Sequence, residues 1–192
     1  MSRVRRVFVE KKPAYAGAGA DLAAEIRSYL GIGSVKRVRI LIRYDVENIS
    51  DEVFETALRC VFSEPPVDEF YLEDYPRGEN ERSFAVEYLP GQFDQRADSA
   101  MQCVRFLKED EECVIRSATV YVVDGAIDDE QFGQIKSYCI NPVDSREAAD
   151  EKPDTLLTEF EQPADIAVLT GFTSMPVEDL NNLYSSLNLA MT

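Results

Sequence analysis

The feature that most constrains the fold is an internal repeat, in which segments of the first half of the chain recur in the same order about 77 residues later. A chance match would be isolated, whereas these matches keep both their order and their apolar pattern. The sequence therefore predicts two copies of one folding unit, at about residues 4–75 and 82–145. The matched segments are VEKKP from Val9 with VEYLP from Val86, ISDEVF from Ile49 with IDDEQF from Ile127, and PVD from Pro66 with PVD from Pro142.

Each copy is predicted to form strand, helix, strand and helix, with room for a short extended tail. The strand segments are rich in β-formers, and the helices carry apolar stripes at helical spacing. Two strands are too few to cover two helices, so we expect the copies to join their sheets around one core. The predicted fold is an α+β pseudo-twofold sandwich, with helices layered on a mostly antiparallel sheet. The expected strands cover 4–12, 35–46, 82–89 and 116–125, and the apolar stripes of the expected helices cover 22–30, 53–61, 97–107 and 132–139. Ser50 is the expected cap at the start of the second helix in the first copy, and Asp128 to Gln131 resemble a capping box at the start of the second helix in the other copy.

The sequence changes character after Ser145. Residues 146–165 are acidic and interrupted by proline, as in connectors that run over a protein surface. From Pro176 an apolar pattern of helical spacing begins. We therefore expect one domain over residues 1–145, followed over residues 146–192 by a connector and the truncated start of a helical domain.

The composition argues against several classes of function. The chain has no histidine, which excludes Ser-His-Asp and Cys-His catalysis and histidine-ligated metals within these residues. The net charge of −16 argues against a nucleic-acid or anionic-membrane partner. No apolar run approaches the roughly 20 residues that a membrane span needs. The four cysteines are widely spaced without a CxxC pair, so we expect reduced thiols in a cytoplasmic protein.

Positive charge gathers near the N-terminus, where residues 1–43 hold ten Lys and Arg against three Asp and Glu. Within this region Arg37, Arg39 and Arg43 alternate with apolar residues, so we predict that they share one face of a strand. A basic sheet face can bind RNA, but RNA-binding sheets usually also display stacking aromatic residues. We favour a solvated or interface-forming sheet face.

The stretch QFDQRAD, which begins at Gln92, is the main candidate for a site. Asp94 and Asp98 beside Arg96 are compatible with an acid–base pair or a magnesium site. They are also typical of a helix start, with Asp94 as the N-cap and Asp98 in the first turn, where the helix dipole favours negative charge. We favour this structural interpretation. The residues that it leaves for contact with a partner are Gln92, Phe93, Gln95 and Arg96.

Five segments together resemble one enzyme family, the large single-chain phosphoribosylformylglycinamidine synthases of purine biosynthesis, also called formylglycinamide ribonucleotide amidotransferases. The resemblance covers nearly the whole chain, and YDVENIS and LPGQFDQRADSA are its most specific parts. It implies an N-terminal domain built like two fused copies of the small PurS subunit, in agreement with the repeat, and then a helical linker domain. The five segments are RVFVEKKP, RYDVENIS, VFSEPPVDE, VEYLPGQFDQRADSA and INPVDSRE.

The resemblance also implies a division of labour. In the family, a synthetase domain binds ATP, magnesium and substrate, and a C-terminal glutaminase releases ammonia with a cysteine nucleophile. This sequence has neither a P-loop nor that nucleophile motif, so we expect no catalytic, cofactor-binding or metal-binding residue in it. The implied role is assembly: a monomeric segment holds the synthetase and glutaminase domains of the same polypeptide so that ammonia passes between them. The candidates for the interdomain interface are Gln92, Phe93, Gln95, Arg96, Arg37, Arg39 and Arg43.

Two other classes of function stay open at this point. One is a small-molecule regulatory module, with Gln92, Gln95 and Arg96 binding an effector at the seam between the copies. The other is a stand-alone interaction domain that binds RNA through the arginine strands, which predicts an affinity that depends strongly on salt.

Overall fold

The computed structural model describes residues 4–157, 168–169 and 171–187. The chain divides into two compact units, Met1–Leu157 and Thr158–Thr192. The described residues of the second unit form a short 3₁₀ helix, η2 (Phe172–Ser174), and the helix α5 (Val177–Ser186). None of the helices in the described part of the chain is both long and apolar enough to cross a membrane.

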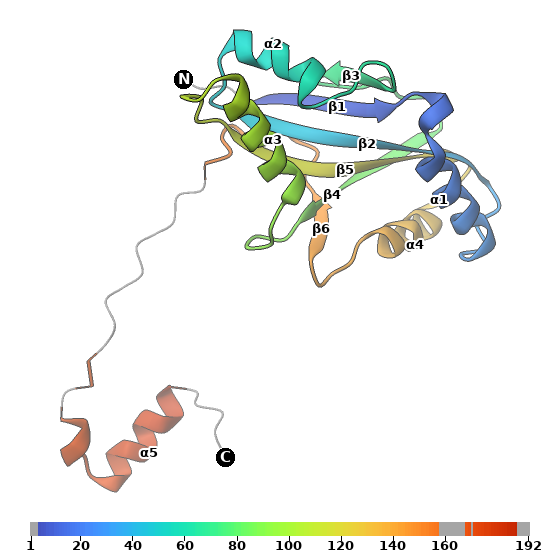
Figure 1. Cartoon of the computed structure of the whole chain (residues 1–192). Helices are drawn as coiled ribbons and strands as arrows, with labels where there is room; N and C mark the ends of the chain where they lie inside the picture. Colours follow the sequence, from blue (N-terminus) through green and yellow to red (C-terminus); the bar gives the residue numbers. More distant parts are fainter. Residues whose placement is uncertain (1–3, 158–167, 170, 188–192) are drawn as a thin grey trace. The chain divides into compact units, whose positions relative to one another are not determined.

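The first unit is α+β, with a six-stranded antiparallel sheet and four α-helices (Figure 1). The strands are β1 (Arg5–Lys11), β2 (Val35–Glu47), β3 (Asp68–Leu72), β4 (Glu81–Tyr88), β5 (Val114–Gly125) and β6 (Ser145–Ala148). The helices are α1 (Gly17–Ser28), α2 (Asp51–Cys60), α3 (Gln95–Leu107) and α4 (Asp129–Cys139), with a 3₁₀ turn, η1 (Pro13–Tyr15), before α1.

The sheet has the strand order β3-β1-β2-β5-β4-β6, which is symmetric about the central pair β2–β5. The three strands of each half of the chain lie side by side, and the expected short tails are β3 and β6 at opposite edges. In the centre, Ile42 pairs with Thr119, and these residues are 77 positions apart, the spacing of the sequence repeat. Ile42 therefore lies opposite its own counterpart, and on either side of it Leu41 and Arg43 each pair with the counterpart of the other, as expected about a pseudo-twofold axis.

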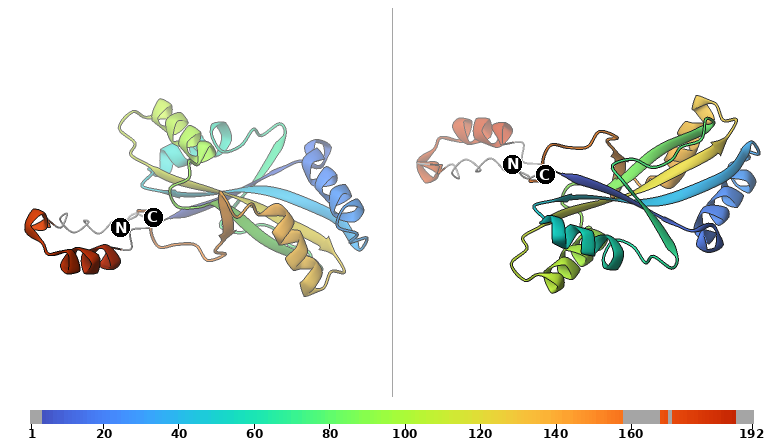
Figure 2. Two further views of the ribbon diagram at one scale, coloured as in Figure 1. Left: turned by 90° about the horizontal axis from the view of Figure 1, so that it is seen from below. Right: turned by 90° about the horizontal axis from the view of Figure 1, so that it is seen from above.

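The helices cover one face of the sheet as two pairs, and each pair takes one helix from each half (Figures 1 and 2). Phe54 and Leu58 of α2 share a core cluster with Val104 of α3. Ile26 of α1 shares the other cluster with Ile135 of α4. Burying one large aliphatic side chain contributes roughly 1.5–3 kcal/mol, so each half depends on the other for much of its stability.

Glycine sets the position of α1 on the sheet. A Cβ atom at Gly19 would lie 2.3 Å from the carbonyl oxygen of Val38 on β2, so the helix reaches the strand only because glycine has no side chain. The helix begins at Gly17, ahead of the apolar stripe that starts at Leu22, and Gly19 lets its first turn lie directly against β2.

Two extended segments cross the opposite face of the sheet: residues 73–80 between β3 and β4, and residues 149–157 after β6. In the first segment, Tyr75 is buried with its ring 4.8 Å from that of Phe8. In the second, Leu156 is 2% exposed. We call residues 149–157 the strap. The first unit thus extends to Leu157, beyond the boundary at residue 145 that the sequence suggested, and the start of the predicted connector belongs to the sheet.

Candidate functional site

The QFDQRAD stretch forms the entry to α3. After a turn in which Gly91 takes a φ of +90°, Asp94 occupies the N-cap of the helix. Its carboxylate accepts hydrogen bonds of 2.9 Å from the Ala97 N–H and from both the N–H and the hydroxyl of Ser117 on β5. The predicted capping role of Asp94 is confirmed, and the same side chain ties α3 to the sheet.

Asp98 lies in the first turn of α3, as predicted, and accepts a hydrogen bond of 2.6 Å from the Gln102 side chain. Both carboxylates of the stretch therefore serve the helix. Over residues 4–157, 168–169 and 171–187, no group of three or more cysteine, aspartate and glutamate side chains is placed to hold a metal ion.

The other residues of the stretch are all exposed, as predicted: Gln92, Phe93, Gln95 and Arg96. Phe93 is 69% exposed, a large value for an aromatic side chain. Arg96 forms no hydrogen bond or ion pair with another residue of the described ranges. It also stands in the first turn of α3, where the helix dipole disfavours positive charge. Neither a partner side chain in the described residues nor the helix dipole therefore stabilises the positive charge of Arg96.

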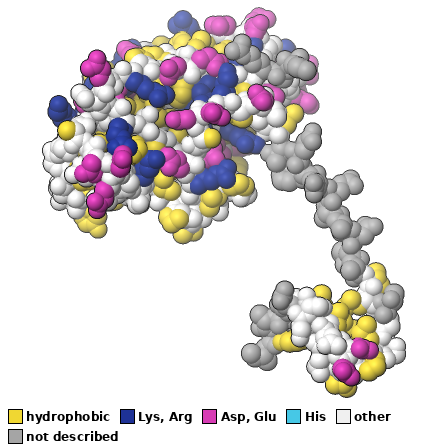
Figure 3. All heavy atoms as spheres, turned by 180° about the vertical axis from the view of Figure 1, so that it is seen from behind, with side chains coloured by type: hydrophobic (Ala, Val, Ile, Leu, Met, Phe, Trp, Pro, Cys, Tyr) yellow, Lys and Arg dark blue, Asp and Glu magenta, His cyan; other side chains and the backbone are white. Residues whose placement is uncertain are grey.

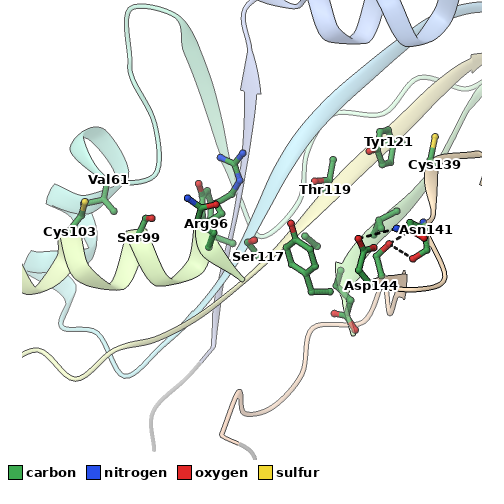
Figure 4. Close-up of a pocket in the computed structure, with 18 residues that line it drawn as sticks. Val61, Arg96, Ser99, Cys103, Ser117, Thr119, Tyr121, Cys139, Asn141 and Asp144 are labelled. Carbon is green, nitrogen blue, oxygen red and sulfur yellow. Dashed lines mark hydrogen bonds between the residues drawn. The ribbon is translucent and has the colours of Figure 1, made fainter. Parts of the chain in front are cut away.

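Arg96 lines a groove of about 680 Å³ on the helix-covered face of the sheet, which we call the α3 groove (Figure 4). Residues of α3 form one side, β5 forms the floor, and the turn between α4 and β6 forms the other side. The residues labelled in Figure 4 on the first side are Val61, Arg96, Ser99 and Cys103, those of the floor are Ser117, Thr119 and Tyr121, and those of the far side are Cys139, Asn141 and Asp144.

The acidic residues of the α3 groove already have partners. Glu87 accepts a hydrogen bond of 2.8 Å from Arg146, and Asp144 accepts one of 3.1 Å from the side-chain amide of Asn141. Burial, and then the charge of Glu25, raise the pKa of Cys139 to about 11, so this thiol stays protonated at neutral pH. Arg96 is thus the charged side chain of the groove that has no partner among the described residues.

A second groove of about 920 Å³ opens beside α1, and we call it the α1 groove. It shares Tyr44 and Arg96 with the α3 groove. The two floors correspond at the repeat spacing of 77, but Ile40 and Ile42 in the α1 groove replace Ser117 and Thr119 in the α3 groove. Two related positions in the fold have therefore acquired different chemistry, apolar in one half and hydroxyl-lined in the other.

The arginines predicted to share a face of β2 do so, but most of them are engaged within the chain. Arg39 pairs with Glu10 at 2.7 Å and with Glu81 at 3.1 Å, and the hydrogen bond to Glu10 raises the pKa of Arg39 further above its usual value. Arg37 pairs with Glu81 at 3.0 Å and remains exposed. Acidic and basic side chains are interspersed on the side of the first unit seen in Figure 3. The continuous arginine face considered for RNA is thus divided into ion pairs.

Arg43 differs from the prediction more strongly, because it is buried under the strap. Its guanidinium donates to the Ala149 carbonyl oxygen at 2.9 Å and lies 3.5 Å from the Asp45 carboxylate. Burial lowers the pKa of Arg43, although the Asp45 charge opposes this. The expectation that Arg43 faces solvent or a partner is therefore corrected.

Sequence reasoning missed the hydroxyl floor of the α3 groove. The signal was present, because Ser117 and Thr119 stand on the same face of β5 as the buried Ile115 and Val123. Polar side chains at such positions indicate either a buried hydrogen bond or an opening over the sheet. Here Ser117 has the first role and Thr119 the second.

Comparison with known proteins adds no family: no protein-family model matches the chain, and no curated protein matches it. The unpaired arginine, the two grooves and the two-part sheet are therefore the observations on which a function has to rest.

Proposed function

We propose that this chain is the N-terminal assembly region of an ATP- and glutamine-dependent phosphoribosylformylglycinamidine synthase in purine biosynthesis. The observation that carries the proposal is an agreement between sequence and topology. YDVENIS and LPGQFDQRADSA resemble that family, which implies two fused PurS-like copies. A sheet in which two sets of three strands meet symmetrically at β2 and β5 is what such a fusion would give.

The two most specific segments lie at the features that distinguish this fold. YDVENIS starts at Tyr44, which lines both grooves, and it includes Asp45 and Glu47, whose carboxylates bind Arg6 and the strap. LPGQFDQRADSA provides the Asp94 cap and the unpaired Arg96. The residues that carry the resemblance therefore line the grooves, bind the strap or cap α3.

In this role the first unit supplies shape and contact surfaces. The synthetase and glutaminase domains of the same cytoplasmic polypeptide bind ATP, magnesium, substrate and glutamine, and the first unit holds them so that ammonia passes from one to the other. The segment itself is a monomer, because its second half already occupies the place where a second copy would pair with β2.

The test is the whole polypeptide encoded by the reading frame that contains this chain. It should form the amidine from formylglycinamide ribonucleotide with either glutamine or ammonium ions, and release ADP and phosphate. Residues 1–192 alone should hydrolyse neither glutamine nor ATP above a mock-purified control. A whole polypeptide that forms no amidine from either nitrogen source, while folded, would refute the proposal.

The volume of the α3 groove favours a second candidate, a module that binds a small regulatory molecule. Clefts of a few hundred Å³ commonly bind such ligands. A thermal-shift screen with purine nucleotides and amino acids separates the two candidates. Saturable stabilisation that is lost in Arg96→Ala would favour the regulatory module over the assembly region.

A further inference from the structure

The α3 groove contains a charge that neither the fold nor the groove itself neutralises. The chain carries a net charge of −16, so carboxylates are abundant, yet none of them in the described ranges pairs with Arg96. The two acids that line the groove, Glu87 and Asp144, accept hydrogen bonds from Arg146 and Asn141 instead. What Arg96 lacks is an anionic group from outside the first unit.

The chemistry around Arg96 favours a carboxylate over a phosphate. A guanidinium binds one carboxylate through two parallel hydrogen bonds. Phosphate sites at helices use the free N–H groups of the first turn. In α3 the Asp94 carboxylate already accepts from the Ala97 N–H and adds negative charge at the same place. A single arginine beside a capped helix therefore suits a ligand with one negative charge.

The surroundings of Arg96 are those of a protein interface. Tyr88 in the groove is 48% exposed, and Phe93 in the loop before α3 is 69% exposed. Exposed aromatic residues beside an arginine form the composition of protein-binding hot spots. Ser99 and Thr119 add hydroxyl groups that can bond to a polypeptide backbone.

We propose that the α3 groove binds a polypeptide segment that places an Asp or Glu carboxylate on Arg96 and an apolar side chain against Tyr88. The identity of the donor rests on the proposed function: the segment belongs to the catalytic portion of the same polypeptide. The α1 groove has Ile40 and Ile42 in place of the hydroxyl floor, so the two related grooves do not bind the same segment.

The experiment uses the whole polypeptide with a photo-crosslinking amino acid in place of Ser99. The control carries the same amino acid in place of Ser137, which is exposed on α4 and lies outside the groove. Ser99 should capture one peptide that contains Asp or Glu, and Ser137 should not capture it. Arg96→Glu should lower the yield by about tenfold or more, because like charges then meet. Changing the captured acidic residue to Arg in the Arg96→Glu background should restore the yield.

Three results would overturn the inference. The first is capture of a peptide without an acidic residue, and the second is a yield that Arg96→Glu leaves unchanged. The third is an increase in melting temperature with inorganic phosphate or AMP that depends on Arg96, which would assign the groove to a small anion. Charge-dependent capture in a polypeptide without synthase activity would leave the groove assignment intact and refute the proposed function. An active synthase that shows no capture would do the reverse.

Discussion

The two halves of the sheet have the same order of elements but differ in the side chains that face the two crossing segments. In the first half this face carries buried charges, whereas the corresponding positions of the second half, at the spacing of 77, are mostly small or apolar. The corresponding pairs are Arg6 with Ser83, Arg43 with Val120, Asp45 with Val122, and Glu47 with Asp124.

The buried charges of the first half hold the strap in place. Arg6 forms a two-pronged pair with Asp45 at 2.6 and 2.9 Å and donates to the Asp150 carbonyl oxygen at 2.6 Å. Glu47 accepts from the backbone N–H of Leu156 at 2.6 Å and from the hydroxyl of Thr155. These contacts fix where the backbone runs on its way to the second unit.

The difference shows what a covalent pair of repeats permits. Buried ion pairs often contribute little net stability compared with apolar side chains of similar size, but removing one partner is costly. The second half has valine at two of these positions, Val120 and Val122, and both are buried in the core. The first half uses charged residues, which make most of the contacts that hold the strap, and Arg116 of β5 in the second half adds one hydrogen bond of 2.7 Å to the Leu156 carbonyl oxygen.

The largest effect is expected from Asp45→Ala, with Val122→Ala as the matched change in the second half. Removing Asp45 leaves Arg6 and Arg43 buried without their carboxylate, which should lower the free energy of unfolding by about 3–5 kcal/mol. Val122→Ala removes only apolar contacts and should cost about 2 kcal/mol. Urea unfolding of both variants measures the difference. Equal losses would mean that the buried charges of the first half contribute no more to stability than the apolar contacts of the second half.

The second prediction compares two helix caps of the second half. Asp94 caps α3 and also accepts two hydrogen bonds from Ser117, whereas Asp128 caps α4 through a local capping box with Gln131. Asp94→Ala should cost about 2 kcal/mol and Asp128→Ala about 1 kcal/mol, because loss of a cap alone costs about 1 kcal/mol. Thermal unfolding tests the order. A smaller loss for Asp94→Ala would show that its bonds to β5 contribute nothing.

The local signals of the sequence predicted much of this fold. The capping box at Asp128 and the N-cap at Asp94 both formed, because each needs only a few neighbouring residues. The order of strands and helices was also predicted, because each element has its own short apolar pattern within each copy of the repeat. At Ser50 the local signal was misleading: this residue stands at the N-cap of α2, but its hydroxyl donates to Glu111, from the other half of the chain, at 3.2 Å.

The strap and the grooves were not predicted because they depend on residues far apart in sequence. Arg6 meets Asp150 across 144 positions, and Arg43 meets Ala149 across 106. The alternation of Arg37, Arg39 and Arg43 indicated their shared face but could not show what covers it. A charged residue on a strand is predicted to be exposed unless the segment that covers it is also known.

The third prediction concerns Glu81 of β4, which links the second half to Arg37 and Arg39 of the first. Burial raises the pKa of Glu81, but the Gly78 N–H and the two arginines outweigh it and lower the pKa overall. A carboxyl whose pKa is lowered by folding contributes stability above its unfolded pKa of about 4.3, and this is lost as pH falls through the folded pKa.

Glu81→Gln should therefore cost about 1 kcal/mol or less at pH 7, as partly exposed ion pairs do. The loss relative to wild type should disappear as the pH falls through the lowered pKa of folded Glu81, where the carboxyl group becomes protonated. Urea unfolding of wild type and Glu81→Gln, measured at several values from about pH 3 to about pH 7, shows whether the two free energies of unfolding converge as the pH falls. A deficit that stays constant with pH would assign the effect to packing and not to charge.

The smallest effect on stability is expected at Arg96, and it sharpens the contrast with the buried Arg6. Arg96→Ala should change the free energy of unfolding by less than about 0.5 kcal/mol, since the side chain is exposed and unpaired within the described residues. Arg105→Ala, an exposed change on the last turn of the same helix, is the control.

In the whole polypeptide the two variants should differ in how well glutamine hydrolysis is coupled to synthesis. Arg96→Ala should hydrolyse glutamine faster than it forms amidine while keeping ammonia-dependent synthesis, because the proposed contact positions domains and takes no part in the chemistry. If Arg96→Ala and Arg105→Ala couple glutamine to synthesis equally well, the first unit uses another surface for assembly.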